Sequence, residues 1–103
     1  MEKKDNSVLT SVFEAEIQIL RRHIKVLKIL SDNEPAGIIR LSEITGYPQH
    51  MVRYSLRILE QEGLIEPSSQ GAITTPKLNE TIPILKNKFK EINQSINNII
   101  DLL

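Results

Sequence analysis

The pattern of hydrophobic and polar positions is clearest in the middle of the chain, between residues 35 and 66. Val52, Leu56 and Leu59 are spaced four and three residues apart, which places them on one face of a helix. Gly63 predicts the end of that helix, because glycine adopts the left-handed C-cap conformation at little cost. We therefore expect a helix over residues 49–62 with an apolar core face. Its opposite face carries five long polar side chains: Gln49, His50, Arg53, Tyr54 and Arg57.

A shorter helix is predicted immediately before it. Its apolar stripe, which we expect to pack against helix 49–62, repeats every three residues: Ile38, Leu41 and Ile44. Asp32 or Asn33 is the candidate N-cap, and Pro35 suits a first turn, where its missing N–H is not needed. Gly46 is expected to end the helix, and Tyr47 in the following turn is expected to pack, partly buried, between the two helices.

Two extended segments after Gly63 predict a β-hairpin. Residues 64–66 and 72–75 flank the five turn-forming residues 67–71. The tip of this hairpin has no lysine or arginine, which makes insertion of a cation into the minor groove of DNA improbable. Its backbone N–H groups and three polar side chains can still contact phosphate: Ser68, Ser69 and Gln70.

A long helix is predicted on the N-terminal side of this unit, ending at about Leu30. Ser11 and Glu14 match a capping box, and Ser7 is the alternative N-cap. The apolar positions predict packing on the central helices and, in the earlier part, on another chain: Phe13, Ile17, Leu20, Ile24 and Leu27. Basic residues on the outer side favour a solvated face over the alternative of phosphate attraction: Arg21, Arg22, His23, Lys25 and Lys28.

The C-terminal segment shows an uninterrupted heptad pattern. It runs through Leu78, Ile82, Leu85, Phe89, Ile92, Ile96, Ile99 and Leu103. Thr81 is the expected N-cap with Pro83 in the first turn, which predicts a helix of about 33 Å. Such a stripe either packs on its own domain or is exposed. Because a domain this small has little apolar surface left to cover it, we expect dimerisation through residues Ile82 to Leu103, in a parallel or antiparallel arrangement.

Composition narrows the classes of function. The 103 residues correspond to one domain with at most an extension, and the 13 basic and 13 acidic residues cancel. The charge is unevenly distributed, since residues 21–57 carry seven Lys or Arg against three Asp or Glu, whereas residues 58–81 carry one against four. The absence of cysteine excludes disulfides and thiolate metal sites. With no apolar run of about 20 residues and no signal-peptide pattern, we expect a cytoplasmic protein without a membrane partner.

The run from Ile38 to Pro76 also resembles a known family. Its segments ITGYP, VRYSLRILEQEGLIEP and GAITTP resemble the winged helix-turn-helix of compact prokaryotic transcription regulators of the MarR and ArsR type, with the greatest similarity to archaeal forms. The resemblance implies a mainly α fold with a small β-hairpin wing, here extended by long terminal helices of which the last is coiled-coil-like. Together with the periodicity of the terminal segments, it predicts a winged helix-turn-helix domain, residues 8–77, and a dimerisation helix, residues 78–103.

These observations favour a homodimeric, sequence-specific DNA-binding transcription regulator with helix 49–62 in the major groove. The candidate DNA-binding residues are Gln49, His50, Arg53, Tyr54 and Arg57, with Arg40 and Lys77 as further phosphate contacts. A protein-interaction module without specific DNA binding is the alternative, favoured by the zero net charge. Neither histidine has a carboxylate at catalytic or metal-ligand spacing, so we expect no enzyme, cofactor or metal. Any small-molecule effector stays unidentified.

Overall fold

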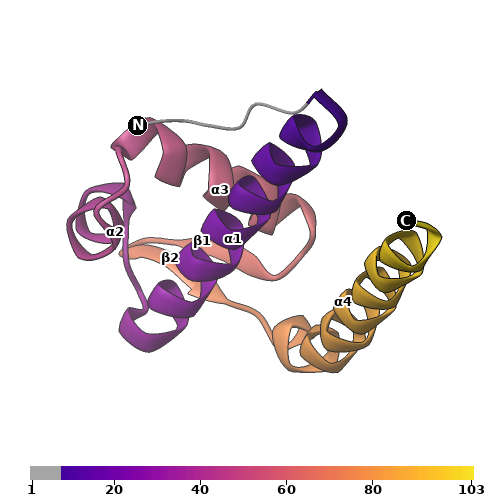
Figure 1. Cartoon of the computed structure of the whole chain (residues 1–103). Coiled ribbons are helices and arrows are strands. Elements are labelled where there is room, and N and C mark those ends of the chain that lie inside the picture. The colour runs from indigo at the N-terminus through magenta and orange to yellow at the C-terminus, as the bar shows by residue number, and fades with distance from the viewer. Residues whose placement is uncertain (1–7) are drawn as a thin grey trace.

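Six elements follow one another along the described residues, 8–103, of the computed structural model (Figure 1). They are α1 (Val8–Asn33), α2 (Ile38–Thr45), α3 (Gln49–Gln61), β1 (Ile65–Ser68), β2 (Gly71–Thr74) and α4 (Lys77–Leu102). The two strands pair antiparallel and form the wing, the hairpin that follows the helix-turn-helix of α2 and α3. The structure therefore confirms the predicted fold: a winged helix-turn-helix with long helices at both ends.

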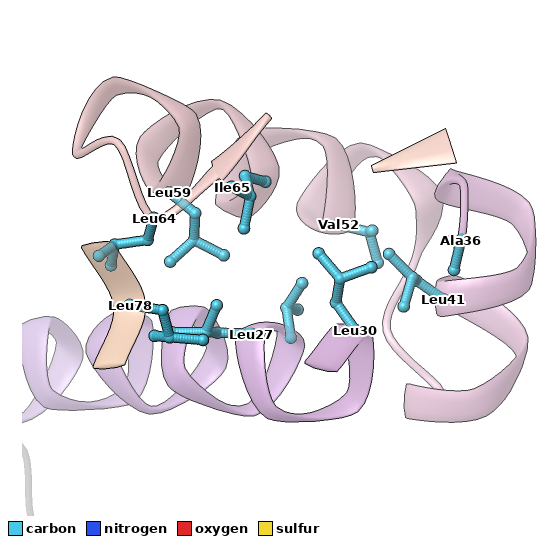
Figure 2. Packing of buried hydrophobic residues seen from close by; sticks show 10 residues of the cluster. Leu27, Leu30, Ala36, Leu41, Val52, Leu59, Leu64, Ile65 and Leu78 are labelled. Carbon is cyan, nitrogen blue, oxygen red and sulfur yellow. The ribbon is translucent and has the colours of Figure 1, made fainter. Parts of the chain in front are cut away.

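The core lies where the C-terminal half of α1 packs against α2, α3 and the start of the wing (Figure 2). Its buried residues are Val26, Leu27, Leu30, Ala36, Leu41, Val52, Leu59, Leu64, Ile65 and Leu78. Val52 and Leu59 confirm the predicted core face of α3, whereas Leu56 is only partly buried. The predicted stripe of α2 was wrong at Ile44, which is 44% exposed because the face of α2 that meets the core centres on Leu41.

Both predicted glycine stops are confirmed. Gly46 ends α2 with a φ of 82°, and its N–H donates to the Ser42 carbonyl at 2.9 Å. Gly63 follows α3 with a φ of 76°. Tyr47 in the intervening turn is partly buried against the core, as predicted, and its carbonyl accepts a hydrogen bond from Ser42 Oγ at 2.6 Å. These contacts fix α3 relative to α2.

Two of the predicted N-caps, Ser11 and Thr81, were wrong. Val8 is already helical, so Ser11 lies inside α1, and the alternative cap, Ser7, lies outside the described residues. Thr81 lies inside α4, because that helix begins four residues earlier, after Pro76, and no side-chain cap forms there. Pro83 is consequently an interior residue of α4. In both cases the helix continues through the polar residue that resembled a boundary.

The predicted start of α2 was also wrong. Asp32 and Asn33 belong to the last turn of α1, where Asp32 pairs with Lys28 and Asn33 Nδ2 donates to the Ile29 carbonyl at 2.8 Å. Helix α2 begins after Gly37, without a side-chain cap, and Pro35 lies in the linker rather than in its first turn.

The connection within the wing is shorter than predicted. The strands pair from Ile65 with Thr74 to Ser68 with Gly71, so only Ser69 and Gln70 join them and the predicted five-residue turn was wrong. The linker between α1 and α2 extends this sheet by one position. There Ala36 and Ala72 exchange two backbone hydrogen bonds, of 3.2 and 2.9 Å. Strand β1 continues to Ser68 and β2 starts at Gly71, so the strand pairing extends further into the segment of turn-forming composition than predicted.

Helix α4 packs on the rest of the domain only near its beginning. Leu78 is its one buried residue, and beyond it the helix stands apart from α1 (Figure 1). An open groove of about 690 Å³ separates the two helices, lined on the α1 side by Phe13, Ile17 and Leu20 and on the α4 side by Phe89, Ile92 and Ile96. The heptad face of α4 and the outer apolar face of α1 thus border one apolar groove.

Candidate nucleic-acid interface

The outer face of α3 is the centre of the candidate interface. Helical geometry places it opposite Val52, Ser55 and Leu59, the three residues of α3 that are buried. It bears the five predicted contact residues, and all of them are exposed: Gln49, His50, Arg53, Tyr54 and Arg57. Because α2, α1 and β1 hold the opposite face, α3 presents this surface as a fixed ridge.

Helix α2 borders one side of that ridge. An open depression between the two helices is lined by Arg40 and Glu43 of α2 and by Gln49 and Arg53 of α3. The structure therefore brings together three residues predicted separately from the sequence. Arg40 Nη2 also donates to Asn33 Oδ1 at 3.4 Å, which directs its guanidinium along the surface between α1 and α2.

Arg53 and Arg57, the two arginines of the α3 ridge, have no ionic partner within residues 8–103. The ion pairs found there are Lys28 with Asp32 and Lys88 with Glu91, both on other elements. Glu60, the acidic residue nearest to Arg57 on the same helix face, does not pair with it. Among the described residues, therefore, no carboxylate engages the guanidinium group of Arg53 or Arg57.

Lys77 is placed differently from the other candidates. Its ammonium donates to the Glu62 carbonyl at 2.8 Å, at the C-terminal end of α3. A cation at this position satisfies an unpaired carbonyl and complements the negative end of the helix dipole. Sequence reasoning missed this capping role, because Lys77 is 15 residues away from Glu62 along the chain.

Helix α1 borders the other side of the ridge through a polar cluster that sequence reasoning also missed. The Ser55 hydroxyl, fully buried on the core face of α3, accepts a hydrogen bond from Arg22 Nε at 3.3 Å and is hydrogen-bonded to His23 Nδ1 at 2.7 Å. The His23 ring lies 5.6 Å from the ring of Tyr54. Burial lowers the pKa of His23 below its ordinary value, and the adjacent Arg22 charge lowers this pKa further. The signal in the sequence that could have revealed this cluster is Ser55, a polar residue on the core face of α3 between Val52 and Leu59.

The tip of the wing offers few groups to a nucleic acid. Ser68 Oγ donates to the Gly71 carbonyl and accepts from the Gln70 N–H at 3.3 Å, so this hydroxyl stabilises the turn itself. Ser69 and Gln70 are exposed and uncharged. Within residues 8–103 no group of three or more His, Asp or Glu side chains is arranged to hold a metal ion. In the same residues no helix combines the length and apolarity that crossing a membrane requires.

Comparisons with known proteins agree with this architecture. The model of the family described as "Bacterial regulatory protein, arsR family" matches residues 21–66, which run from α1 through α3 to the start of the wing. Among solved structures, the activation domain of the phage T4 transcription factor MotA is similar with a TM-score of 0.54 and 18% identity, over 71% of this chain and 78% of that chain. No curated protein matches the sequence. The resemblance to winged helix-turn-helix transcription regulators is thereby confirmed.

Proposed function

We propose that this chain, whose residues 21–66 carry the helix-turn-helix of the arsR family, is a sequence-specific DNA-binding transcription regulator that acts as a homodimer. The observation that supports this function best is the ridge of α3. It is exposed, uniformly polar and fixed by the core, and its two arginines have no ionic partner within residues 8–103. An α-helix of this kind fits the major groove of B-form DNA.

Each side chain of the ridge has a chemical role in this proposal. Arg53 and Arg57 donate paired hydrogen bonds to O6 and N7 of guanine, and Gln49 pairs with N6 and N7 of adenine. His50 and Tyr54 reach bases or phosphates, and Arg40 binds the phosphate strand beside α2. Lys77 adds charge at the far end of α3. To contact DNA, the Lys77 ammonium would either donate to a phosphate oxygen in addition to the Glu62 carbonyl or exchange that carbonyl for the phosphate.

The homodimer is proposed from the exposed apolar faces of the two long helices. Phe13 of α1 is 47% exposed, and Ile92 and Ile99 of α4 are 40% and 59% exposed. In this proposal residues 8–77 form the DNA-binding domain and residues 78–103 pair with a second copy. A two-fold dimer would present its two α3 helices to half-sites about 34 Å apart, one turn of DNA.

A second candidate function is a protein-interaction module that does not read DNA. It is favoured by the zero net charge and by the wing tip without a cation. The similar solved structure is the activation domain of a transcription factor, so the same fold is found in a domain that is not described as DNA-binding. Salt dependence separates the two candidates, because about eight phosphate contacts per dimer would give a log–log slope of about −7.

Selection of genomic DNA fragments tests the proposal. Purified protein is incubated with fragments of its own genome, and the retained fragments are sequenced, with Arg53→Ala as the matched variant. We expect an enriched inverted repeat for the wild-type protein and none for the variant. Retention without a common motif would indicate nonspecific binding. Absence of retention by a folded protein would favour the interaction module.

A further inference from the structure

The polar cluster at the crossing of α1 and α3 contains more hydrogen-bond donors than the fold uses. Arg22 Nε and His23 Nδ1 both contact the buried Ser55 hydroxyl. Within residues 8–103, the two Nη nitrogens of Arg22, Nε2 of His23 and the hydroxyl of Tyr54 have no hydrogen-bond partner. Three side chains from two helices therefore gather unused polar atoms at the crossing of α1 and α3: Arg22 and His23 are held by Ser55, and Tyr54 packs on His23.

The anchoring reduces the cost of ordering these side chains around a ligand. Because Ser55 holds the Nε atom of Arg22, the guanidinium loses less rotational freedom on binding than that of a free surface arginine. The tilted packing of His23 on Tyr54, with ring planes at 51°, restrains the tyrosine in the same way. Cationic donors in a fixed arrangement are the groups that bind phosphate oxygens best.

The local charge favours an anionic ligand. No acidic residue lies three or four positions from Arg22 or His23 on α1, or from Tyr54 on α3. The nearest charged residues at those spacings are Lys25 and Arg57. No carboxylate on the same helix is therefore spaced to compete with a ligand for these unused donors.

The position of the cluster relative to α3 identifies the anion. Around the circumference of α3, Gln49 and Arg53 lie toward α2, whereas Tyr54 lies on the opposite side, against α1. The wing lies on the α2 side as well, since it lines an open depression with Leu56 and Glu60. When a helix occupies the major groove, which is about 12 Å wide, one sugar–phosphate strand runs along each of its sides. With α3 in such a groove, Arg40 would lie near one strand and the cluster near the other.

We propose that Arg22, His23 and Tyr54 form a phosphate-binding site for the DNA strand that borders the α1 side of the major groove. This inference rests on the proposed function and adds to it a contact surface on α1. Arg22 supplies the charge through its Nη groups, and His23 and Tyr54 supply further donors. The site would fix the register of α3 in the groove without reading bases.

The test measures how the affinity for a duplex retained by the wild-type protein depends on potassium chloride concentration. Arg22→Ala is compared with Arg22→Lys and with Lys90→Ala, which removes the same charge from an exposed position of α4 that does not line the α1–α4 groove. We expect Arg22→Ala to reduce the log–log slope by about 0.9 per protomer, or about 1.8 for a dimer, because one phosphate contact is lost from each chain. Arg22→Lys and Lys90→Ala should keep the wild-type slope.

Two further variants separate binding from folding. Arg22→Gln retains an amide donor toward Ser55 without the charge, and replaces Arg22→Ala in the comparison if that variant does not fold. Tyr54→Phe keeps the ring against His23 and removes only the hydroxyl, so we expect a few-fold weaker affinity with an unchanged slope.

The outcomes distinguish this proposal from the function on which it rests. A reduced slope for Arg22→Ala in a folded protein supports the phosphate site. An unchanged slope with a lowered melting temperature would mean that Arg22 only supports Ser55, and would overturn the site. In that case loss of the specific motif in Arg53→Ala would still support the regulator. Failure of the wild-type protein to bind any duplex would reject both.

Discussion

At the residue scale, Arg53 is the side chain on which the proposed readout depends most. It lies on the ridge of α3, beside Gln49 and Arg40, and has no ionic partner within residues 8–103. We predict that Arg53→Ala weakens binding to the selected operator by about 1–3 kcal/mol per half-site, the usual contribution of a bidentate contact with guanine. Fluorescence anisotropy with operator and scrambled duplexes measures the difference.

The control for this prediction is Arg53→Lys, which keeps the charge and removes the planar fork. We expect it to retain nonspecific affinity while losing most of the discrimination between the two duplexes. Equal losses on operator and scrambled DNA would show that Arg53 contacts phosphate rather than a base.

His23 predicts how stability changes with pH. Its pKa in the folded protein lies below the ordinary 6.5, mainly through burial. Between the folded value and 6.5 the unfolded chain therefore binds more protons, so stability rises with pH in that interval and is lost as pH falls through it. We expect urea unfolding at fixed protein concentration to show this loss below neutral pH and His23→Gln to reduce it.

His50 provides the comparison, because it is the other histidine and is exposed on the ridge. His50→Gln should retain the wild-type pH dependence of stability. If both substitutions had the same effect, the pH dependence would arise elsewhere, for example in the carboxylates, and the assignment to His23 would be wrong.

At the scale of elements, the wing depends on one glycine. Gly71 has a φ of 130°, and a Cβ there would lie 2.7 Å from the carbonyl carbon of Ala36. We predict that Gly71→Ala destabilises the protein, because the strained backbone conformation alone costs about 1–3 kcal/mol. Steric repulsion between the added Cβ and the linker adds to this loss. Thermal or urea unfolding measures it.

Gly37 is the matched control for this substitution. Its φ is −102°, and an added Cβ would meet no atom within 4 Å. Gly37→Ala should therefore cost only about 1 kcal/mol, the typical cost of placing alanine at an N-cap, without any steric repulsion in addition. Similar losses at both glycines would mean that the Ala36–Ala72 pairing contributes little to the wing.

Periodicity explains which elements could be predicted from the sequence and which could not. The spacing of Val52 and Leu59 locates α3 because that helix buries one face. The heptad pattern locates α4 through a continuous apolar face, although most of that face is not buried within this chain. The ends of helices were harder, since Ser11 and Thr81 have the composition of caps yet lie inside longer helices. A cap depends on where the apolar face ends in three dimensions, which local composition does not specify.

In the candidate site too, some features could be predicted from local sequence patterns and others could not. The ridge residues follow from the polar face of one helix, so each was predictable. The contacts of Arg22 and His23 with Ser55 span 33 and 32 positions and depend on how α1 crosses α3, which no local pattern encodes. The pairing of Ala36 with Ala72, which joins the linker before α2 to the wing, was missed for the same reason.

At the scale of the whole molecule, zero net charge and an exposed apolar groove set conditions on the proposed DNA binding. Because the 13 basic and 13 acidic residues cancel, the affinity proposed for DNA would come from the local surface around α3 and from the second such surface of a dimer. We propose the groove between α1 and α4 as the place where the second chain packs, because its lining is apolar and α4 packs little on its own domain. Dimerisation and DNA binding are therefore expected to fail together.

Ile92→Glu tests this coupling. Ile92 lines the groove, is 40% exposed and lies outside the buried core, so a charge there should disrupt pairing of two chains and leave the domain folded. We predict a monomer by sedimentation equilibrium with wild-type helix content, and at least a tenfold weaker affinity for the two-half-site operator, because each domain then binds alone. Asn87→Glu adds the same charge on the opposite, exposed face of α4 and should remain dimeric. The proposed dimer would be contradicted if the wild-type protein were monomeric and still bound the two-half-site operator as tightly as Asn87→Glu does. The exposed faces of α1 and α4 would then have to serve a different protein partner.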